Sequence, residues 1–158
     1  MSNQKIEQTE ILIIGAGPSG AVAAGLLRKQ GRKVLIIEKE TFPRFSIGES
    51  LLPQSMQYIE EAGMLQDVVE AGFQYKNGAA FAKGEMTTAF DFRDKFSKGW
   101  GTTYQVQRAN FDKVLADAAE KAGAEIRYRH VVTAVDVSGE QPVVKVRSEE
   151  GEEYTVTA

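Results

Sequence analysis

The chain has 158 residues, of which 42% are hydrophobic and 26% charged, a balance typical of a globular protein and not of a disordered or fibrous one. Its 19 basic and 22 acidic residues give a net charge of -3, which argues against nucleic acid as a partner, and the absence of cysteine excludes disulfides and thiolate metal sites. Residues 1–10 are polar without a signal-peptide pattern, and no apolar run reaches the roughly 20 residues of a membrane span, so we expect a cytoplasmic protein with no integral membrane segment.

Residues 1–40 predict a strand, a helix and a second strand. The apolar run 11–14 ends at a glycine and is typical of a central parallel strand buried on both faces. Pro18 suits a first helical turn and Gly31 suits a left-handed C-terminal cap, so a helix is expected between them. The apolar run 34–37 then supplies a second buried strand, and the three elements form a Rossmann-type βαβ unit.

Residues 41–106 predict a long loop followed by an insertion rich in strands. The stretch 41–50 contains proline, arginine and glycine without periodicity, which indicates a loop that leaves the sheet. A helix is expected behind Pro53. Strand-like segments follow at 79–83, 86–92 and 101–106.

Residues 107–158 predict a return helix and then an antiparallel β segment. Asn110 is placed to cap the helix and Gly123 to end it. Its apolar face would consist of Phe111, Val114, Leu115, Ala118, Ala119 and Ala122. Strand-like segments follow at 126–128, 131–137, 143–146 and 154–156. The expected fold class is therefore α/β, and because the chain stops soon after a strand begins, we expect 1–158 to be one domain from the N-terminal part of a longer protein.

The segment from Gly15 to Gly20 has the pattern G-x-G-x-x-G between the first strand and the helix. Gly15 permits the tight turn, Gly17 lets the backbone approach a pyrophosphate, and Gly20 lets helix and strand pack closely. Pro18 and Ser19 complete the turn, and the unpaired N–H groups at the helix N-terminus would hold the negative charge. The pattern in this context predicts a dinucleotide site.

Glu38 ends the second strand, eighteen positions after Gly20. A carboxylate at this place can accept both hydroxyl protons of an adenosine ribose and would repel a 2′-phosphate. The residues therefore favour FAD or NAD over NADP.

The segment from Glu38 through Lys39 and on to Pro53 contains F-P-R-F-S-I-G-E-S-L-L-P. It resembles the flavin-dependent halogenase and geranylgeranyl reductase branch of the para-hydroxybenzoate hydroxylase-like FAD enzymes. The resemblance favours FAD over NAD and implies a Rossmann-like FAD-binding domain. It also implies that the flavin lies beside a set of loop residues, namely Arg44, Gly48, Glu49 and Ser50. Lys39 is assigned to the cofactor site with Glu38.

Two further segments resemble the same family. Arg108, between Q-V-Q and F-D, is similar to an arginine that approaches the FAD phosphate and ribityl region, and Val132 is similar to a backbone contact to adenine. The resemblance also implies a second fingerprint, an aspartate- and glycine-rich motif for the ribityl chain, which is expected beyond residue 158.

Lys76 is the one candidate catalytic residue. Its segment, K-N-G-A-A-F, resembles the part of phenol-type halogenases that supplies an active-site lysine, which is thought to orient hypohalous acid; an ordinary surface lysine is the alternative. Trp100 is the only tryptophan, so the halogenase W-x-W-x-I-P signature is not found in the chain. The sole histidine, His130, is expected to be a packing or edge residue, and no residue spacing suggests a metal site.

The function implied by the resemblance is that of a flavin-dependent monooxygenase or halogenase. Its reduced FAD would react with oxygen near a small organic substrate, while the protein orients the reactants and excludes water. Only one nucleotide fingerprint is present, so electrons would come from transiently bound NAD(P)H or from a partner flavin reductase. The fragment alone is expected to be inactive.

Three alternatives stay open at this stage. A geranylgeranyl-reductase-like enzyme, which reduces isolated double bonds, would have the same G-E-S-x-x-P loop. A non-catalytic module would bind FAD only as a structural group. A domain with degenerate binding residues would bind no flavin.

Overall fold

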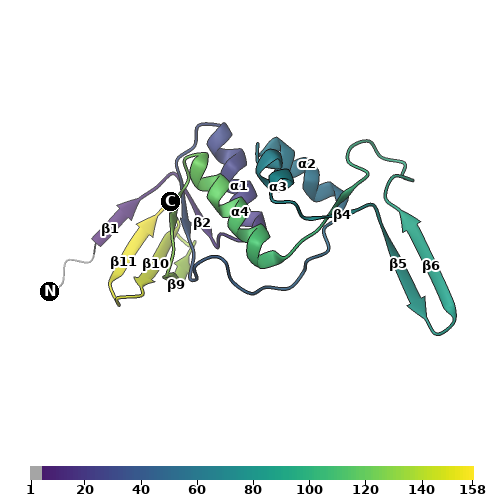
Figure 1. Cartoon of the computed structure of the whole chain (residues 1–158). Coiled ribbons are helices and arrows are strands. Elements are labelled where there is room, and N and C mark those ends of the chain that lie inside the picture. The colour runs from purple at the N-terminus through teal and green to yellow at the C-terminus, as the bar shows by residue number, and fades with distance from the viewer. Residues whose placement is uncertain (1–4) are drawn as a thin grey trace.

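The computed structural model describes residues 5–158, and Figure 1 shows its helices and strands in chain order. Residues 1–4, which belong to the polar start and to the predicted βαβ unit, lie outside the described residues. The helices are α1 (Pro18–Lys29), α2 (Pro53–Glu61), α3 (Leu65–Glu70) and α4 (Arg108–Lys121). The strands are β1 (Lys5–Gln8), β2 (Ile11–Ile14), β3 (Val34–Ile37), β4 (Gln74–Lys76), β5 (Gly78–Lys83), β6 (Met86–Asp91), β7 (Thr103–Gln105), β8 (Glu125–Arg127), β9 (His130–Asp136), β10 (Val143–Ser148) and β11 (Glu153–Thr157).

The centre of the fold is a parallel sheet with the strand order β2-β3-β8. Strand β3 is buried along its whole length because its two faces meet different layers. Val34 and Ile36 pack into a core with α1 and α4, whereas Leu35 and Ile37 pack against the second sheet. The domain therefore has three layers, with helices, parallel sheet and second sheet stacked in that order (Figure 1).

The second sheet has the order β1-β11-β10-β9. Strand β1 pairs parallel with β11, so the start of the described chain meets its end, and the remaining pairs are antiparallel. The predicted antiparallel β segment is thereby confirmed. The polar strand β1 was not predicted, because the four residues from Lys5 to Gln8 show no apolar alternation of their own.

The prediction that 11–14 forms a central strand buried on both faces is wrong in the described part of the chain. The strand exists, but β2 lies at the edge of the parallel sheet, and 56% of Ile14 is exposed. Strand β3 holds the central position because β2 and β8 flank it. An apolar run of four residues does not show whether a strand lies at the edge or at the centre of a sheet.

The return helix begins earlier than predicted. Its N-cap is Gln107 and its first residue is Arg108, so Asn110 lies inside the first turn and does not cap the helix. The carbonyl of Gln107 already accepts the N–H of Phe111 at 2.9 Å, which starts the helical hydrogen bonding before Asn110 is reached. The predicted end is confirmed: Gly123 follows the C-cap with a positive φ of 95°.

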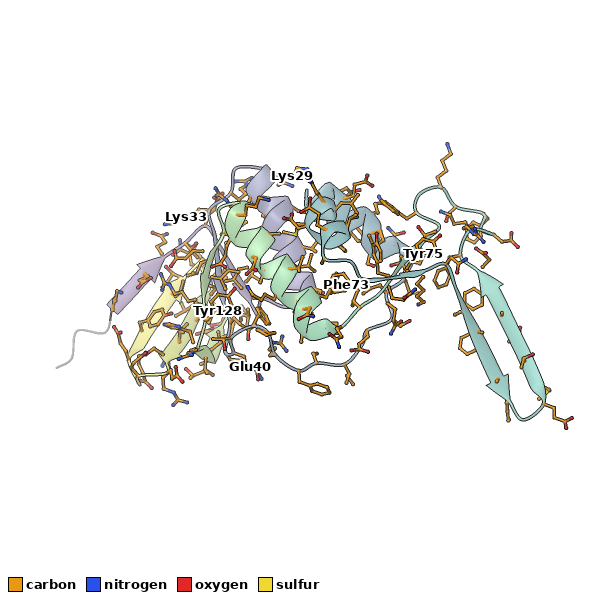
Figure 2. The ribbon with its side chains drawn as sticks, in the orientation of Figure 1. Lys29, Lys33, Glu40, Phe73, Tyr75 and Tyr128 are labelled. Carbon is orange, nitrogen blue, oxygen red and sulfur yellow. The ribbon has the colours of Figure 1, made fainter. Side chains whose placement is uncertain are left out.

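The insertion contains two separate two-stranded sheets. Strands β4 and β7 pair close to the helices, whereas β5 and β6 form a hairpin that projects away from the rest of the domain (Figure 1). The hairpin exposes large apolar side chains, including Phe81, Met86 and Phe90. Just before β4, Phe73 packs edge-to-face on Phe111 of α4, with ring centroids 5.7 Å apart. Figure 2 shows Phe73 beside the helices.

Candidate functional site

Two positions where β2 leads into α1 require glycine, one in the turn and one in the first turn of the helix. Gly15 has a φ of 94°, and its N–H donates to the carbonyl of Ile37 at 2.8 Å, which joins the turn to the end of β3. A Cβ on Gly20 would lie 2.0 Å from the carbonyl oxygen of Gly15, so any side chain there would force α1 away from the sheet. The roles expected of Gly15 and Gly20 in the turn therefore have a direct geometric basis.

The N-terminus of α1 presents main-chain donors to its surroundings. Gly17 is the N-cap, Pro18 is the first helical residue, no side chain caps the helix, and no acidic residue stands in its first turn. The first N–H groups of a helix have no intrahelical acceptor, and the helix dipole adds partial positive charge at this end. This terminus can bind an anion.

Glu38 is buried, with 3% of its surface exposed, and its carboxylate is fixed by the main chain. One oxygen accepts the N–H of Ala16 at 2.8 Å, and the other accepts the N–H of Glu40 at 2.9 Å. Each carboxylate oxygen retains a further lone pair, so the group can also accept hydrogen bonds from a ligand.

A cavity of about 280 Å³ opens in front of this turn. Its lining comes from the ends of β2 and β3, the α1 turn, the long loop and β9: Ile14, Gly15, Gly17, Ile37, Glu38, Lys39, Arg44, His130, Val131 and Val132. A parallel sheet characteristically binds ligands outside the carboxyl ends of its strands, which is where this cavity lies.

Strand β9 contributes to the cavity a main-chain edge that no neighbouring strand covers in the described residues. It is the outermost strand of its sheet, and the N–H of His130 at its beginning donates to the carbonyl of Glu38 at 3.0 Å. Because the groups of residues two apart face the same edge of a strand, the N–H and carbonyl of Val132 also face the Glu38 side. Its side chain points away from that edge and packs against the apolar core between the two sheets.

Arg44 reaches the cavity from the long loop. Its guanidinium lies 5.1 Å above the ring of Phe42, and Phe42 is held in turn by an edge-to-face contact with Tyr128, which Figure 2 labels. The Nε of Arg44 lies 3.2 Å from a Glu40 carboxylate oxygen, yet it is buried and makes no hydrogen bond. A terminal nitrogen of Arg44 lies 3.7 Å from the position that a Cβ on Gly17 would take. The side chain is therefore beside the α1 turn with donors unused.

Arg108 lies in the first turn of α4 and is bound on two sides. Its Nε and Nη2 donate to the two carboxylate oxygens of Asp112 at 2.7 and 3.0 Å, and its Nη1 donates to the carbonyl of Ile47 at 2.6 Å. The hydrogen bonds that Arg108 donates to the Asp112 carboxylate raise the pKa of the Arg108 guanidinium. Gly48, with a φ of 89°, brings the loop so close that a Cβ would lie 3.3 Å from Nη1.

The loop segment around Ser50 is held by β7 and β4. The carbonyl of Glu49 accepts the N–H of Val106 at 2.8 Å, and Ser50 forms a bridge with Gln105. The ammonium group of Lys76 donates to the hydroxyl of Ser50 at 2.5 Å and to the carbonyl of Leu51 at 2.9 Å. Lys76 is therefore tied to the loop and is not a free surface lysine.

The predicted residues fall into two groups in the structure. The cavity brings together Gly15, Gly17, Glu38, Lys39, Arg44 and Val132. The others do not line it. Pro18 and Ser19 border a separate apolar hollow of about 160 Å³, and Gly20 lies in the first turn of α1. Gly48, Glu49 and Ser50 belong to the long loop, which Arg108 of α4 and Lys76 of β4 contact.

Sequence reasoning missed several residues of the site. Ala16 contributes only its N–H, which no residue pattern reveals. Asp112 was noted only as part of a family segment, although its spacing of four from Arg108 on a helix could have indicated the ion pair. His130 has the expected packing contact, edge-to-face on Tyr154, but it also lines the cavity.

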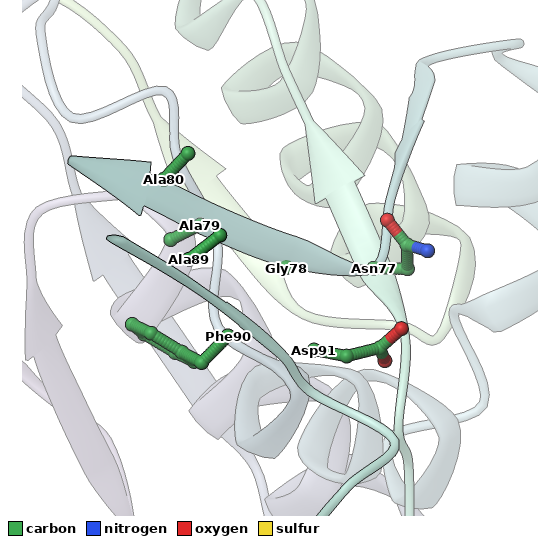
Figure 3. A pocket seen from close by; sticks show the side chains of 7 residues that line it. All are labelled: Asn77, Gly78, Ala79, Ala80, Ala89, Phe90 and Asp91. Carbon is green, nitrogen blue, oxygen red and sulfur yellow. The ribbon is translucent and has the colours of Figure 1, made fainter. Parts of the chain in front are cut away.

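A larger hollow of about 420 Å³ lies along the β5–β6 hairpin, and Figure 3 shows the side chains that line it. It contains none of the predicted cofactor residues. Its one carboxylate, Asp91, is half-buried and paired with Arg93, whose hydrogen bonds lower the pKa of Asp91 to about 2. The chemistry of this hollow therefore does not match that of the dinucleotide site.

Residues 5–158 contain neither a metal-binding cluster nor a membrane-spanning helix. No group of three or more His, Asp or Glu side chains there is placed to hold a metal ion. In the same range, none of the helices has the length and apolar character that crossing a membrane requires.

Comparisons with known proteins agree with a dinucleotide site at the cavity beside α1 and Glu38. The FAD binding domain family matches residues 8–158. A tryptophan 2-halogenase of Chondromyces crocatus is 35% identical over 150 residues, which cover 94% of this chain and 28% of that protein. A flavoprotein/dehydrogenase of Cytophaga hutchinsonii superposes with a TM-score of 0.91 at 47% identity, covering 96% of this chain and 38% of the other. A myxobacterial chondrochloren halogenase gives a TM-score of 0.86 at 36% identity, covering 96% of this chain and 36% of the other.

The chain belongs to the FAD binding domain family, and its cofactor is FAD. Its relatives include flavin-dependent halogenases, so the predicted resemblance to that branch of FAD enzymes and the predicted α/β fold are confirmed. The chain spans 28% of the tryptophan 2-halogenase and 38% of the Cytophaga protein.

Proposed function

We propose that this chain is the FAD-binding part of a flavin-dependent monooxygenase or halogenase that acts on a small organic substrate. The observation that carries the proposal is a single cavity in which three kinds of group meet: the uncapped N-terminus of α1, the carboxylate of Glu38 and the open edge of β9. They correspond to the diphosphate, the ribose and the purine of an adenine dinucleotide.

The adenylate half of FAD would be bound mainly by the main chain. The N–H groups around Gly17 and Ser19 at the start of α1 would hold the diphosphate, with Arg44 adding a positive charge beside Gly17. Glu38 would accept the ribose hydroxyl protons through its remaining lone pairs. The N–H and carbonyl of Val132 would pair with the adenine edge, and Lys39 would border the same cavity.

The flavin half would lie along the loop that follows Arg44. Gly48, Glu49 and Ser50 form a strand-like segment bonded to β7, and this segment offers main-chain groups and little side-chain bulk at Gly48. A loop held in this way can fix the isoalloxazine ring and keep water from it. Arg108 supports the segment through the carbonyl of Ile47.

Lys76 would be the catalytic residue. FAD, when bound, supplies the redox chemistry with oxygen. The ammonium group of Lys76 lies against Ser50, which belongs to the segment assigned to the flavin, so it could orient a hypohalous acid by donating an N–H. The ring of Phe92 lies 5.0 Å from the ammonium nitrogen, which is close enough for a cation–π contact.

The whole protein requires components beyond these residues. Electrons would come from NAD(P)H or from a partner flavin reductase, and the location would be cytoplasmic.

We propose that 1–158 form one domain, divided into the βαβ unit at 1–40, the flavin-proximal loop and insertion at 41–106, and the return helix with its β segment at 107–158. Taken alone, this domain would be inactive.

The test is an assay of the full-length protein with FAD, a reductant, oxygen and a halide salt, offered a panel of phenols, indoles and pyrroles. Halide incorporation identifies a halogenase, and incorporation of one oxygen atom without halide identifies a monooxygenase. Lys76→Ala should abolish halide incorporation, whereas Lys83→Ala, on the exposed hairpin, should leave it unchanged. A protein that binds FAD but consumes no oxygen with any reductant would contradict the proposal and favour a structural role for the flavin.

A further inference from the structure

Asp112 is a fully buried carboxylate that the proposed function does not use. It lies in the second turn of α4 with none of its surface exposed. Both of its oxygens accept hydrogen bonds from Arg108, in the bidentate geometry that gives strong charge-assisted pairs. Burying a charge is unfavourable unless it is paired in this manner, so Asp112 must have a partner to be tolerated in the fold.

Most hydrogen-bond donors of the Arg108 side chain are used by other groups of the protein. Two of its nitrogens bind Asp112, and the third binds the carbonyl of Ile47, next to Gly48. The absence of a side chain on Gly48 is what permits this approach, because a Cβ would lie 3.3 Å from Nη1. Asp112, Arg108 and Ile47 therefore form a chain of contacts that holds the loop against α4.

Arg44 also approaches the Asp112 carboxylate, but without a hydrogen bond. Its Nη2 lies 3.7 Å from an oxygen of Asp112, which is an ion pair but too long for a hydrogen bond. Its Nε makes no hydrogen bond even though it is buried. Asp112 and the nearer carboxylate of Glu40, 3.2 Å from Nε, thus both attract the Arg44 guanidinium, and Asp112 accepts none of its hydrogen bonds.

We propose that Asp112 is a positioning residue for the cofactor. It aligns Arg108 to fix the main chain at Ile47 and Gly48, and it draws Arg44 to the place where that guanidinium meets the diphosphate. The inference deepens the proposed function and rests on it. It gives Arg108 an indirect role, through the loop, and leaves Arg44 as the arginine that contacts the cofactor.

Whether FAD affinity rises or falls when the charge of Asp112 is removed distinguishes a positioning role from a purely electrostatic one. FAD carries a negatively charged diphosphate, so removing a nearby negative charge would strengthen its binding if Asp112 acted only through its charge. If Asp112 acts by positioning the two arginines, the same substitution weakens binding.

The experiment is a titration of the flavin-free full-length protein with FAD, comparing Asp112→Asn with the wild-type protein. The matched control is Asp117→Asn, on the same helix, because Asp117 forms an i,i+4 ion pair with Lys113 at 2.6 Å but is exposed. We expect the dissociation constant to rise about tenfold or more for Asp112→Asn, as for other lost charged hydrogen bonds, and to stay unchanged for Asp117→Asn.

Equal or tighter FAD binding by Asp112→Asn would overturn the inference while leaving the proposed function intact, whereas a wild-type protein that binds no FAD would overturn the proposed function itself. If Asp112→Asn does not fold, the double variant Asp112→Leu with Arg108→Met replaces the pair by apolar side chains, a change that buried ion pairs often tolerate. A folded double variant is expected to show the same loss of FAD affinity, and retained affinity would overturn the inference.

Discussion

Glu38→Gln is the substitution that examines the cofactor site most closely. The side chain keeps its shape, but one acceptor oxygen becomes an NH2 group. In the structure both carboxylate oxygens accept buried main-chain N–H groups, from Ala16 and from Glu40. One of these donors will therefore face another donor, and the ribose hydroxyls will lose a charged acceptor.

The expected size of the effect follows from these hydrogen bonds. Loss of a hydrogen bond to a charged group corresponds to about 1.5–3 kcal/mol, which would raise the dissociation constant for FAD about 10- to 150-fold. The unpaired main-chain N–H would also lower the free energy of unfolding by about 1–3 kcal/mol. The two effects are separable, because the second is present without FAD.

The assay is a titration of the flavin-free protein followed by the quenching of FAD fluorescence, with thermal unfolding of the same sample. The control is Glu85→Gln in the turn of the β5–β6 hairpin, which makes the same change of charge far from the site. An FAD affinity for Glu38→Gln within twofold of the wild-type value would refute the assignment of Glu38 to the ribose.

Three further predictions concern the turn, the lysine and the hairpin. Gly20→Ala should abolish FAD binding and lower the melting temperature, since the added Cβ would lie 2.0 Å from the carbonyl of Gly15; a stable variant with normal affinity would contradict the packing argument. Lys76→Ala should retain FAD binding while losing substrate turnover, measured by titration and product assay on one sample, and a parallel loss of both would assign Lys76 to the cofactor instead. Because pairing with Arg93 lowers the pKa of Asp91 to about 2 from an ordinary 3.8, the contribution of this pair to stability should be present above pH 3.8 and lost as the pH falls toward 2. Melting temperatures across that range should fall less for Asp91→Asn, and an identical pH dependence would show that the pair contributes nothing.

The elements best predicted from the sequence are those whose burial is uniform. The run 34–37 is apolar at every position because β3 is covered on both faces, and the sequence pattern reports that directly. The run 11–14 has the same pattern but lies at a sheet edge, since the pattern does not record which strands become neighbours. Strand β1 was not found because its pairing partner, β11, is at the other end of the chain.

The site was predictable where chemistry demands a residue type. Gly15 and Gly20 follow from a positive φ and a close approach of two main chains, and Glu38 follows from its place at the end of β3. Val132 came only from the family resemblance, because its main-chain edge carries no side-chain signal. The role of Asp112 depends on distances to Arg44 and Arg108, and these distances arise only when the loop has folded onto α4.

The central claim is that the cavity between α1, Glu38 and β9 binds the adenylate half of FAD. It is tested most directly by titrating the flavin-free full-length protein with FAD and, separately, with FMN, which has the same flavin ring but lacks the adenylate. The account predicts one FAD bound per chain and an affinity for FMN lower by at least about two orders of magnitude, since the contacts to ribose, diphosphate and adenine would be absent. Equal affinity for FMN and FAD would contradict it.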